Sequence, residues 1–345
     1  MNASASSDRN PLTETQAEQT RQLLERVRYE MKKVIVGQDA LMERLLMAVM
    51  VHGHVLVEGA PGLAKTLMLK TLAQVLSLGF KRIQFTPDLL PSDVVGTRIY
   101  NPANGQFTTE PGPIFTHFVL ADEINRAPAK VQSALLEAMQ EGQVTLGHET
   151  FVLPKPFLVM ATQNPLESEG TYPLPEAQLD RFLFKLLVDY PDSVAELAIL
   201  QRVGEGGVAV AAPPVGIVSA DALATIAQQV QQVYLDPAMM ATIVQVVQAT
   251  RGRVPLPGGL ERFIHAGASP RGSLALASAS KALALLQGRT YVLPEDLRAV
   301  LLDCLRHRVW ISYQGLAAGH TVEALLESLW QEHGSIATTR SSVNA

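Results

Sequence analysis

The stretch Gly59-Ala60-Pro61-Gly62-Leu63-Ala64-Lys65-Thr66 decides the fold that we expect for this chain. A short apolar run, residues 54–58, precedes it, and Leu67 begins a helix-compatible segment after it. A strand, a small-residue loop and a helix in this order form a phosphate cradle, because the loop N–H groups and the positive end of the helix converge on the phosphates. We therefore expect residues 59–67 to bind a nucleotide, although an ordinary Gly/Pro turn would have the same order.

The loop fits the P-loop pattern G-x-x-x-x-G-K-[ST] at every fixed position except the second glycine, which here is Ala64. We expect Ala64 to lie in the first turn of the helix, at right-handed backbone angles that suit alanine. Gly62 is then the position where a positive φ is expected. In this interpretation Lys65 reaches the β- and γ-phosphates of ATP, and the Thr66 hydroxyl ligates Mg²⁺.

Length and composition predict a folded protein rather than a disordered or fibrous one. The chain has 345 residues, of which 47% are hydrophobic and 18% charged, enough for two domains. A net charge of −5 argues against a surface that coats duplex nucleic acid. The single cysteine, Cys304, excludes an internal disulfide and a cysteine-rich zinc site, and its helical context predicts that it is buried.

No segment of the sequence has the pattern of an export signal or of a membrane span. Residues 1–12 begin with a polar stretch that has no apolar export signal, and we expect them to form a disordered lead. The most apolar long stretch, residues 41–57, is interrupted by charged residues, histidines and a glycine, so it is too broken to cross a bilayer. We expect a cytoplasmic protein without membrane insertion.

Alternating strands and helices predict an α/β domain over residues 13–190. An amphipathic helix over residues 13–33 and a second helix over 39–51 come first. Five apolar strands follow, at residues 54–58, 81–85, 118–121, 157–161 and 182–188. We expect helices between them, including one over 86–94 that begins at Pro87 and one that begins at Pro128 and stops at Gly142. Two hairpins, over residues 96–109 and 143–155, interrupt this order.

After residue 190 the pattern becomes helical. Apart from a Gly/Ala/Pro-rich loop at 204–216, the period predicts helices over residues 193–202, 221–233, 237–251, 273–287, 294–308 and 321–333. The predicted architecture is thus a P-loop core with a five-stranded parallel sheet and two hairpin insertions, followed by a smaller all-α domain over 191–345.

Polar residues end the apolar strands, where an open α/β sheet binds its ligands. Asp122 and Glu123 follow one strand, and Asn164 follows another. In phosphoryl transfer, Asp122 would hold Mg²⁺ together with Thr66, Glu123 would act as general base toward water, and Asn164 would hold that water or the γ-phosphate. The alternative for the acidic pair is a solvated charge pair before the following helix.

Three arginines compete for the role of stabilising charge on the γ-phosphate. Arg181 lies at an edge that a neighbouring subunit could meet, Arg271 begins a helix, and Arg126 follows the acidic pair. The alternative for each is an ordinary salt bridge.

Five stretches together resemble the MoxR family of AAA+ ATPases. They are the loop at 59–66, Ala-Asp-Glu-Ile-Asn-Arg-Ala-Pro at 121–128, Gln-Ser-Ala-Leu-Leu-Glu-Ala-Met at 132–139, Ala-Thr-Gln-Asn-Pro at 161–165, and Glu-Ala-Gln-Leu-Asp-Arg-Phe at 176–182. The resemblance covers residues 34–308, and alanine at position 64 is common in that family.

The resemblance implies roles for the candidate residues. Asp122 and Glu123 would be the Walker B pair, Asn164 sensor 1, Arg181 the arginine finger and Arg271 sensor 2, acting on its own subunit's nucleotide or on a neighbour's. The hairpins resemble the helix-2 insert and the pre-sensor-1 hairpin, which face the pore of a ring that is commonly hexameric. Family members act as chaperone-like ATPases on partner proteins, often with a von Willebrand factor A domain protein, and some assist metal-cofactor insertion.

Other functions stay open at this point. A nucleic-acid motor is disfavoured by the acidic balance and by Arg98 as the only cation of the first hairpin. A non-hydrolysing scaffold is disfavoured by the complete set of candidate catalytic residues. A motor subunit of a metal chelatase is the alternative nearest to a chaperone-like ATPase.

Overall fold

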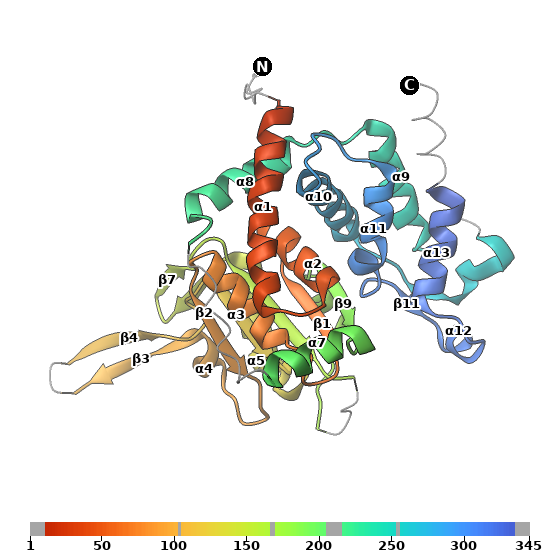
Figure 1. The fold of residues 1–345 in the computed structure, drawn as a ribbon. Coiled ribbons are helices and arrows are strands. Elements are labelled where there is room, and N and C mark those ends of the chain that lie inside the picture. Colours follow the sequence, from red (N-terminus) through yellow and green to blue (C-terminus); the bar gives the residue numbers. More distant parts are fainter. Residues whose placement is uncertain (1–10, 103–104, 166–169, 205–215, 253–255, 335–345) are drawn as a thin grey trace, which may run out of the picture.

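The computed structural model describes residues 11–102, 105–165, 170–204, 216–252 and 256–334. Its centre is a five-stranded sheet in the order β2-β5-β8-β1-β9, in which all neighbouring strands are parallel (Figure 1). The strands are β1 (Val55–Gly59), β2 (Phe80–Gln84), β5 (Phe118–Asp122), β8 (Leu158–Gln163) and β9 (Phe184–Val188). The predicted α/β core is confirmed, with each strand within two residues of its expected start.

Helices cover both faces of this sheet because each central strand is apolar on both sides. Val55 and Val57 pack with α1 (Glu14–Val34), α2 (Asp39–Met50) and α3 (Lys65–Val75). Leu56, on the opposite face, packs with α5 (Ala129–Glu141). Period-two burial of this kind fixes the strand register and leaves only the strand ends open to a ligand.

The two expected hairpins are present. One pairs β3 (Gly96–Asn101) with β4 (Gln106–Pro111), and it projects from the domain in Figure 1. The other pairs β6 (Gln143–Leu146) with β7 (Glu149–Val152).

The helix expected over 86–94 is placed wrongly by the sequence pattern, because α4 spans only Pro91–Val95. Thr86 closes a turn with Leu89 at 3.2 Å, and Pro91 holds Leu90 in an extended conformation, so the helix begins at Pro91.

The second part of the chain is helical but not entirely so. Its helices are α7 (Ser193–Gly204), α8 (Ala220–Gln232), α9 (Pro237–Ala249), α10 (Pro270–Leu286), α11 (Pro294–Leu305), α12 (Tyr313–Ala317) and α13 (Val322–His333). The expectation of an all-α part misses a short antiparallel pair, β10 (Ile264–Ala266) with β11 (Trp310–Ile311). Strands this short carry no readable alternation. The loop expected at 204–216 lies almost wholly outside the described residues.

Helix α1 joins the two parts of the chain. Thr13 caps it in a capping box with Gln16, and its buried face, which includes Leu24, Val27 and Met31, belongs to the same apolar cluster as the helices α8–α11 and α13. Thr20 adds a hydrogen bond of 2.6 Å to Gln229 of α8.

Leu12, which the sequence places in the disordered lead, is instead buried against the core. Residues 1–10 of that lead lie outside the described residues. Among the described helices, none is long and apolar enough to cross a membrane.

Candidate nucleotide site

A cavity of about 400 Å³ opens at the carboxyl ends of the central strands. It brings together residues from the loop after β1, from the end of β5 and from β8, all three being neighbours in the sheet. Its lining includes Gly59, Pro61, Gly62, Leu63, Ala64, Lys65, Thr66, Leu67, Arg82, Asp122, Glu123, Thr162, Gln163 and Asn164. The predicted nucleotide-binding, metal-binding and water-orienting residues thus converge. Ala60, which is buried, is the one predicted loop residue outside this lining.

Two residues of the loop, Gly62 and Ala64, have a positive φ, where one was expected. Gly62 has φ 83° with open space where a side chain would begin, as predicted. Ala64 is not in the first turn: it is the N-cap of α3 at φ 54° and ψ 18°, so the expectation of right-handed angles is wrong. The chain reverses into the helix there, and alanine carries a cost of about 1 kcal/mol that glycine would not.

Lys65 begins α3 and lies over its own loop. Its Nζ donates a hydrogen bond of 2.7 Å to the carbonyl oxygen of Gly59. Burial lowers the pKa of the Lys65 ammonium, and the negative charges of Asp122 and Glu123 oppose that shift. A half-buried cation gains from an anionic ligand, and its bond to the Gly59 carbonyl oxygen can be exchanged for one to a phosphate oxygen.

Asp122 is held by two residues that the sequence interpretation missed. Thr162 donates from Oγ1 to Asp122 Oδ1 at 2.6 Å and accepts the N–H of Glu123 at 2.9 Å. Arg82, from the edge strand β2, donates from Nη2 to Asp122 Oδ2 at 2.6 Å. Arg82 and Thr162 both lie within strands. The only sequence signal that could have identified them is their polar character near the carboxyl end of a strand.

Glu123 is oriented from two sides. Gln84 donates to its Oε2 at 2.9 Å, and Arg126 forms an ion pair with the same oxygen at 2.9 Å. Arg126, the third candidate arginine, is thereby placed beside Glu123 and is absent from the cavity lining. Asn164 is buried at the end of β8 and lines the cavity.

The donor set fits ATP with Mg²⁺. The Thr66 hydroxyl and the Asp122 carboxylate are hard oxygen ligands beside the cationic Lys65, and magnesium binds proteins through one or two carboxylates together with substrate phosphates. The open space at Gly62 admits a phosphate against the loop backbone.

Comparison with known proteins agrees with this geometry. Residues 54–184 match the model of the ATPase family associated with various cellular activities (AAA), and residues 260–329 match that of the AAA lid domain. The chain is 49% identical to chaperone MoxR1 of Mycobacterium tuberculosis over 311 residues, 89% of this chain and 81% of that one. It belongs to the MoxR family of AAA+ ATPases.

Two further proteins place the chain in the same family. Protein MoxR of Methylorubrum extorquens is 32% identical over 296 residues, 82% of this chain and 86% of that one. The solved structure of a protein from Cytophaga hutchinsonii, assigned as an ATPase, superposes with a TM-score of 0.84 at 45% identity, covering 92% of this chain and 96% of that chain. The protein is accordingly a P-loop ATPase with a helical lid.

The remaining two candidate arginines of this MoxR-family protein lie elsewhere. Arg181 and Arg271 line a second cavity, of about 300 Å³, with residues 51–54 just before β1 and with Asp180 and Leu183 just before β9. Arg181 donates to the carbonyl oxygen of Leu136 at 2.6 Å, and Arg271 reaches Gln140 at 3.4 Å. This cavity is at the amino ends of the strands, whereas the nucleotide cavity is at their carboxyl ends.

Proposed function

We propose that subunits of this ATPase assemble into a ring, hexameric as the family resemblance implies, in which each ATP is held by one subunit and completed by the next. One observation carries the proposal. Lys65, Asp122 and Glu123 line one cavity of the chain, and Arg181 and Arg271 line another at the opposite edge of the sheet. A neighbouring copy that presents its arginine cavity to the nucleotide cavity supplies both missing cations, so Arg271 acts in trans along with Arg181.

Within one subunit, the division of work follows the contacts. Lys65 leaves the carbonyl of Gly59 and binds the β- and γ-phosphates, while Thr66 and Asp122 hold Mg²⁺, which when bound neutralises phosphate charge. Glu123 accepts the proton of the attacking water, its Oε2 being fixed by Gln84 and Arg126. Asn164 holds the water or the γ-phosphate by hydrogen bonding.

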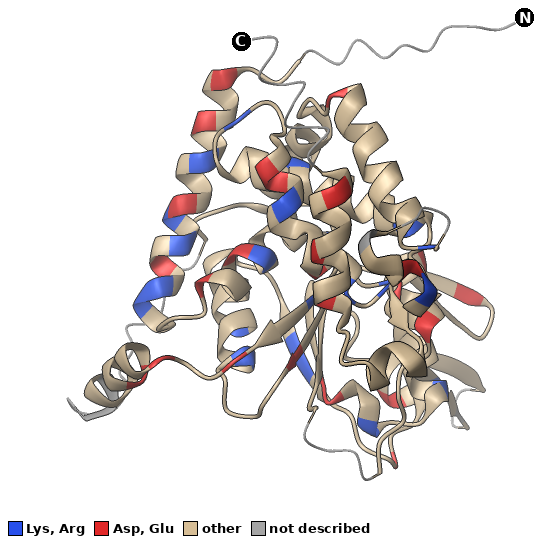
Figure 2. Cartoon of the chain, turned by 90° about the vertical axis from the view of Figure 1, so that its right-hand side faces the viewer, with Lys and Arg blue, Asp and Glu red and all other residues tan. Residues whose placement is uncertain are grey.

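A protein client is the partner that the surface favours. Arg98, the cation of the β3–β4 hairpin, packs over the ring of Phe107 at 5.2 Å and against Gly147 of the other hairpin, so it does not extend toward a phosphate backbone. Acidic and basic residues are interspersed along α1, the helix at the left of Figure 2. One relative is named a chaperone.

We therefore infer a chaperone-like remodeller or activator of partner proteins, with a von Willebrand factor A domain protein among its partners and metal-cofactor insertion among its possible tasks. A motor subunit of a metal chelatase is the alternative. Affinity purification of the tagged protein from its own cells distinguishes the two, because a chelatase would bring down a porphyrin-binding subunit.

Complementation between two inactive variants tests the shared site. The acceptor variant, Arg181→Ala, keeps an intact nucleotide cavity but supplies no finger, and the donor variant, Glu123→Gln, supplies its arginines but cannot activate water. Each alone should lose ATPase activity by about a hundredfold or more, and co-expressed mixed assemblies should regain it. Failure of the mixed assembly to regain activity, with both variants assembled, would refute completion in trans.

A further inference from the structure

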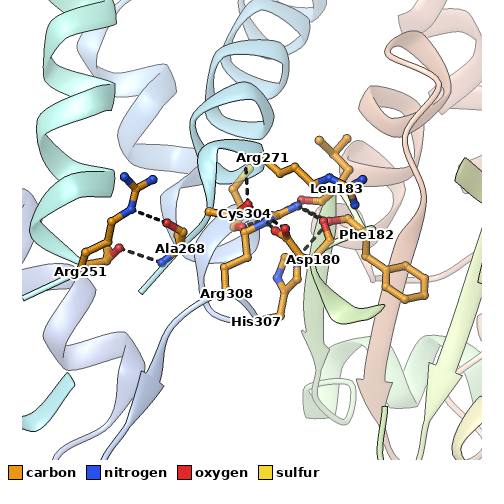
Figure 3. A network of polar contacts seen from close by, with 11 residues as sticks. Asp180, Phe182, Leu183, Arg251, Ala268, Arg271, Cys304, His307 and Arg308 are labelled. Atoms are coloured by element: carbon orange, nitrogen blue, oxygen red, sulfur yellow. Dashed lines mark hydrogen bonds and ion pairs between the residues drawn. The ribbon is translucent and has the colours of Figure 1, made fainter. Parts of the chain in front are cut away.

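A partly buried polar network joins the two segments that carry Arg181 and Arg271 (Figure 3). Its centre is the Asp180 carboxylate, one residue before Arg181. Ser269, the N-cap of α10 and two residues before Arg271, donates from Oγ to Asp180 Oδ2 at 2.7 Å and accepts the N–H of Arg271 at 3.0 Å. One carboxylate thus connects both arginine segments, although they are far apart in the sequence.

Arg308 holds the other side of the same carboxylate. It is 3% exposed, and its Nε donates to Asp180 Oδ1 at 2.8 Å. Its Nη2 donates to the carbonyl oxygens of Asp180 at 3.1 Å and Phe182 at 2.6 Å, and its Nη1 donates to those of Leu183 and Cys304. A guanidinium has five N–H donors, and each of them has an acceptor here. The backbone on both sides of Arg181 is therefore fixed to the lid.

Close packing supports the network from the lid. The backbone N–H of Ala268 donates to Thr250 Oγ1 at 3.0 Å, and Arg251 donates to the carbonyl oxygen of Ala268 at 2.8 Å, which fixes the residue before Ser269. A side chain at Gly272 would meet Ala268 and Leu305 at 3.1 Å, so the absence of one lets α10 approach α11. The start of α10 is thereby held rigidly.

We propose that Asp180, Ser269 and Arg308 form a positioning joint that sets the placement of Arg181 and Arg271 relative to each other. The joint makes the two arginines one preorganised unit, which a subunit presents to its neighbour's ATP. This inference rests on the proposed completion of the site in trans. Its residues touch no reacting atom of their own subunit's ATP, so they affect the neighbour's hydrolysis and leave the subunit's own nucleotide binding unchanged.

Ser269→Ala, introduced separately into each member of the complementing pair, tests the joint. In the donor (Glu123→Gln) it should lower the regained ATPase rate about tenfold, because an arginine displaced by a fraction of an ångström loses most of its effect. In the acceptor (Arg181→Ala) it should leave the rate within about twofold, since the interface to which that subunit contributes its arginines is already inactive without Arg181. The affinity of Ser269→Ala alone for a fluorescent ATP analogue should equal that of the wild type.

Two controls separate positioning from mere stability. Ser219→Ala removes the equivalent cap of α8, whose Oγ accepts the N–H of Ala222 at 3.2 Å, and in the donor it should leave the regained rate unchanged. Ser269→Thr keeps both the helix cap and the hydroxyl group toward Asp180. In the donor it should therefore leave the regained ATPase rate at the value of the parent pair.

If Ser269→Ala lowers the regained ATPase rate equally in donor and acceptor, or does not lower it in the donor, the proposed joint is wrong while completion in trans still holds. A parent pair that regains no activity overturns both.

Discussion

Protonation of His54 should make this ATPase lose stability in acid by an amount that the structure allows to be calculated. His54 precedes β1 and is buried between α5 and β8: its Nε2 lies 3.1 Å from the carbonyl oxygen of Met139, and its Nδ1 accepts the N–H of Val159 at 3.1 Å. The second bond requires a bare Nδ1, so the ring is neutral with its proton on Nε2. Burial is the main reason why the pKa of His54 falls from 6.5 to about 4.

The sign follows from which state binds the proton. The unfolded chain takes it up near pH 6.5 and the folded chain only near pH 4, so the contribution is complete above pH 6.5 and is lost as the pH falls from 6.5 to 4. Between pH 7.5 and 5.0 the difference amounts to about 2 kcal/mol of unfolding free energy, rising to about 3 kcal/mol below pH 4.

Urea unfolding, followed by far-ultraviolet circular dichroism at one protomer concentration, checks this value. His54→Gln cannot titrate, and the loss of its bond to Val159 lowers stability equally at both pH values. The wild type should therefore lose about 2 kcal/mol more than this variant between pH 7.5 and 5.0, the other histidines being common to both proteins. Equal losses in the two proteins would refute the reasoning.

Three further outcomes test the nucleotide cavity. Glu123→Gln should bind ATP with wild-type affinity while turnover falls by orders of magnitude, and unchanged turnover would remove Glu123 from the chemistry. Ala64→Gly should raise the free energy of unfolding by up to about 1 kcal/mol, whereas Ala64→Val, which places a β-branched side chain at positive φ, should lower it by about 2 kcal/mol in urea titrations. Arg82→Gln frees Asp122 Oδ2 and should lower the Mg²⁺ concentration for half-maximal nucleotide binding about two- to fivefold; an unchanged or higher midpoint in a calorimetric titration contradicts this.

The nucleotide cavity could be predicted because its chemistry follows directly from strand order. Asp122 ends an apolar strand, and Lys65 and Asn164 each come after one. Parallel strands bring such positions to one edge whatever their distance in the sequence. The backbone conformation of the loop was harder to predict from the sequence. The positive φ of Ala64 depends on how the chain turns into α3, which no single residue in the loop reveals.

The second cavity and its joint were not predictable in this way. Arg308 and Asp180 are separated by 128 positions, and each reads as an ordinary charged residue near the end of a helix. Their pairing depends on the packing of α11 beside β9, and a buried guanidinium is recognised only by its acceptors, which here include backbone carbonyls. The local sequence around Arg308 gives no indication of these acceptors.

Strand direction gives one constraint on Arg181 that holds independently of any detail of its side chain. β1 and β9 are adjacent and parallel, with Val55 opposite Phe184 and Gly59 opposite Val188. The P-loop follows β1, and Arg181 precedes β9, so a full strand of about 16 Å separates the two edges at which they lie. An arginine side chain is shorter than that span. In the ring that we propose, Arg181 therefore acts on the ATP of a neighbouring copy. A motion of the lid, to which the backbone beside Arg181 is fixed through Arg308, would then reach the neighbour's ATP first.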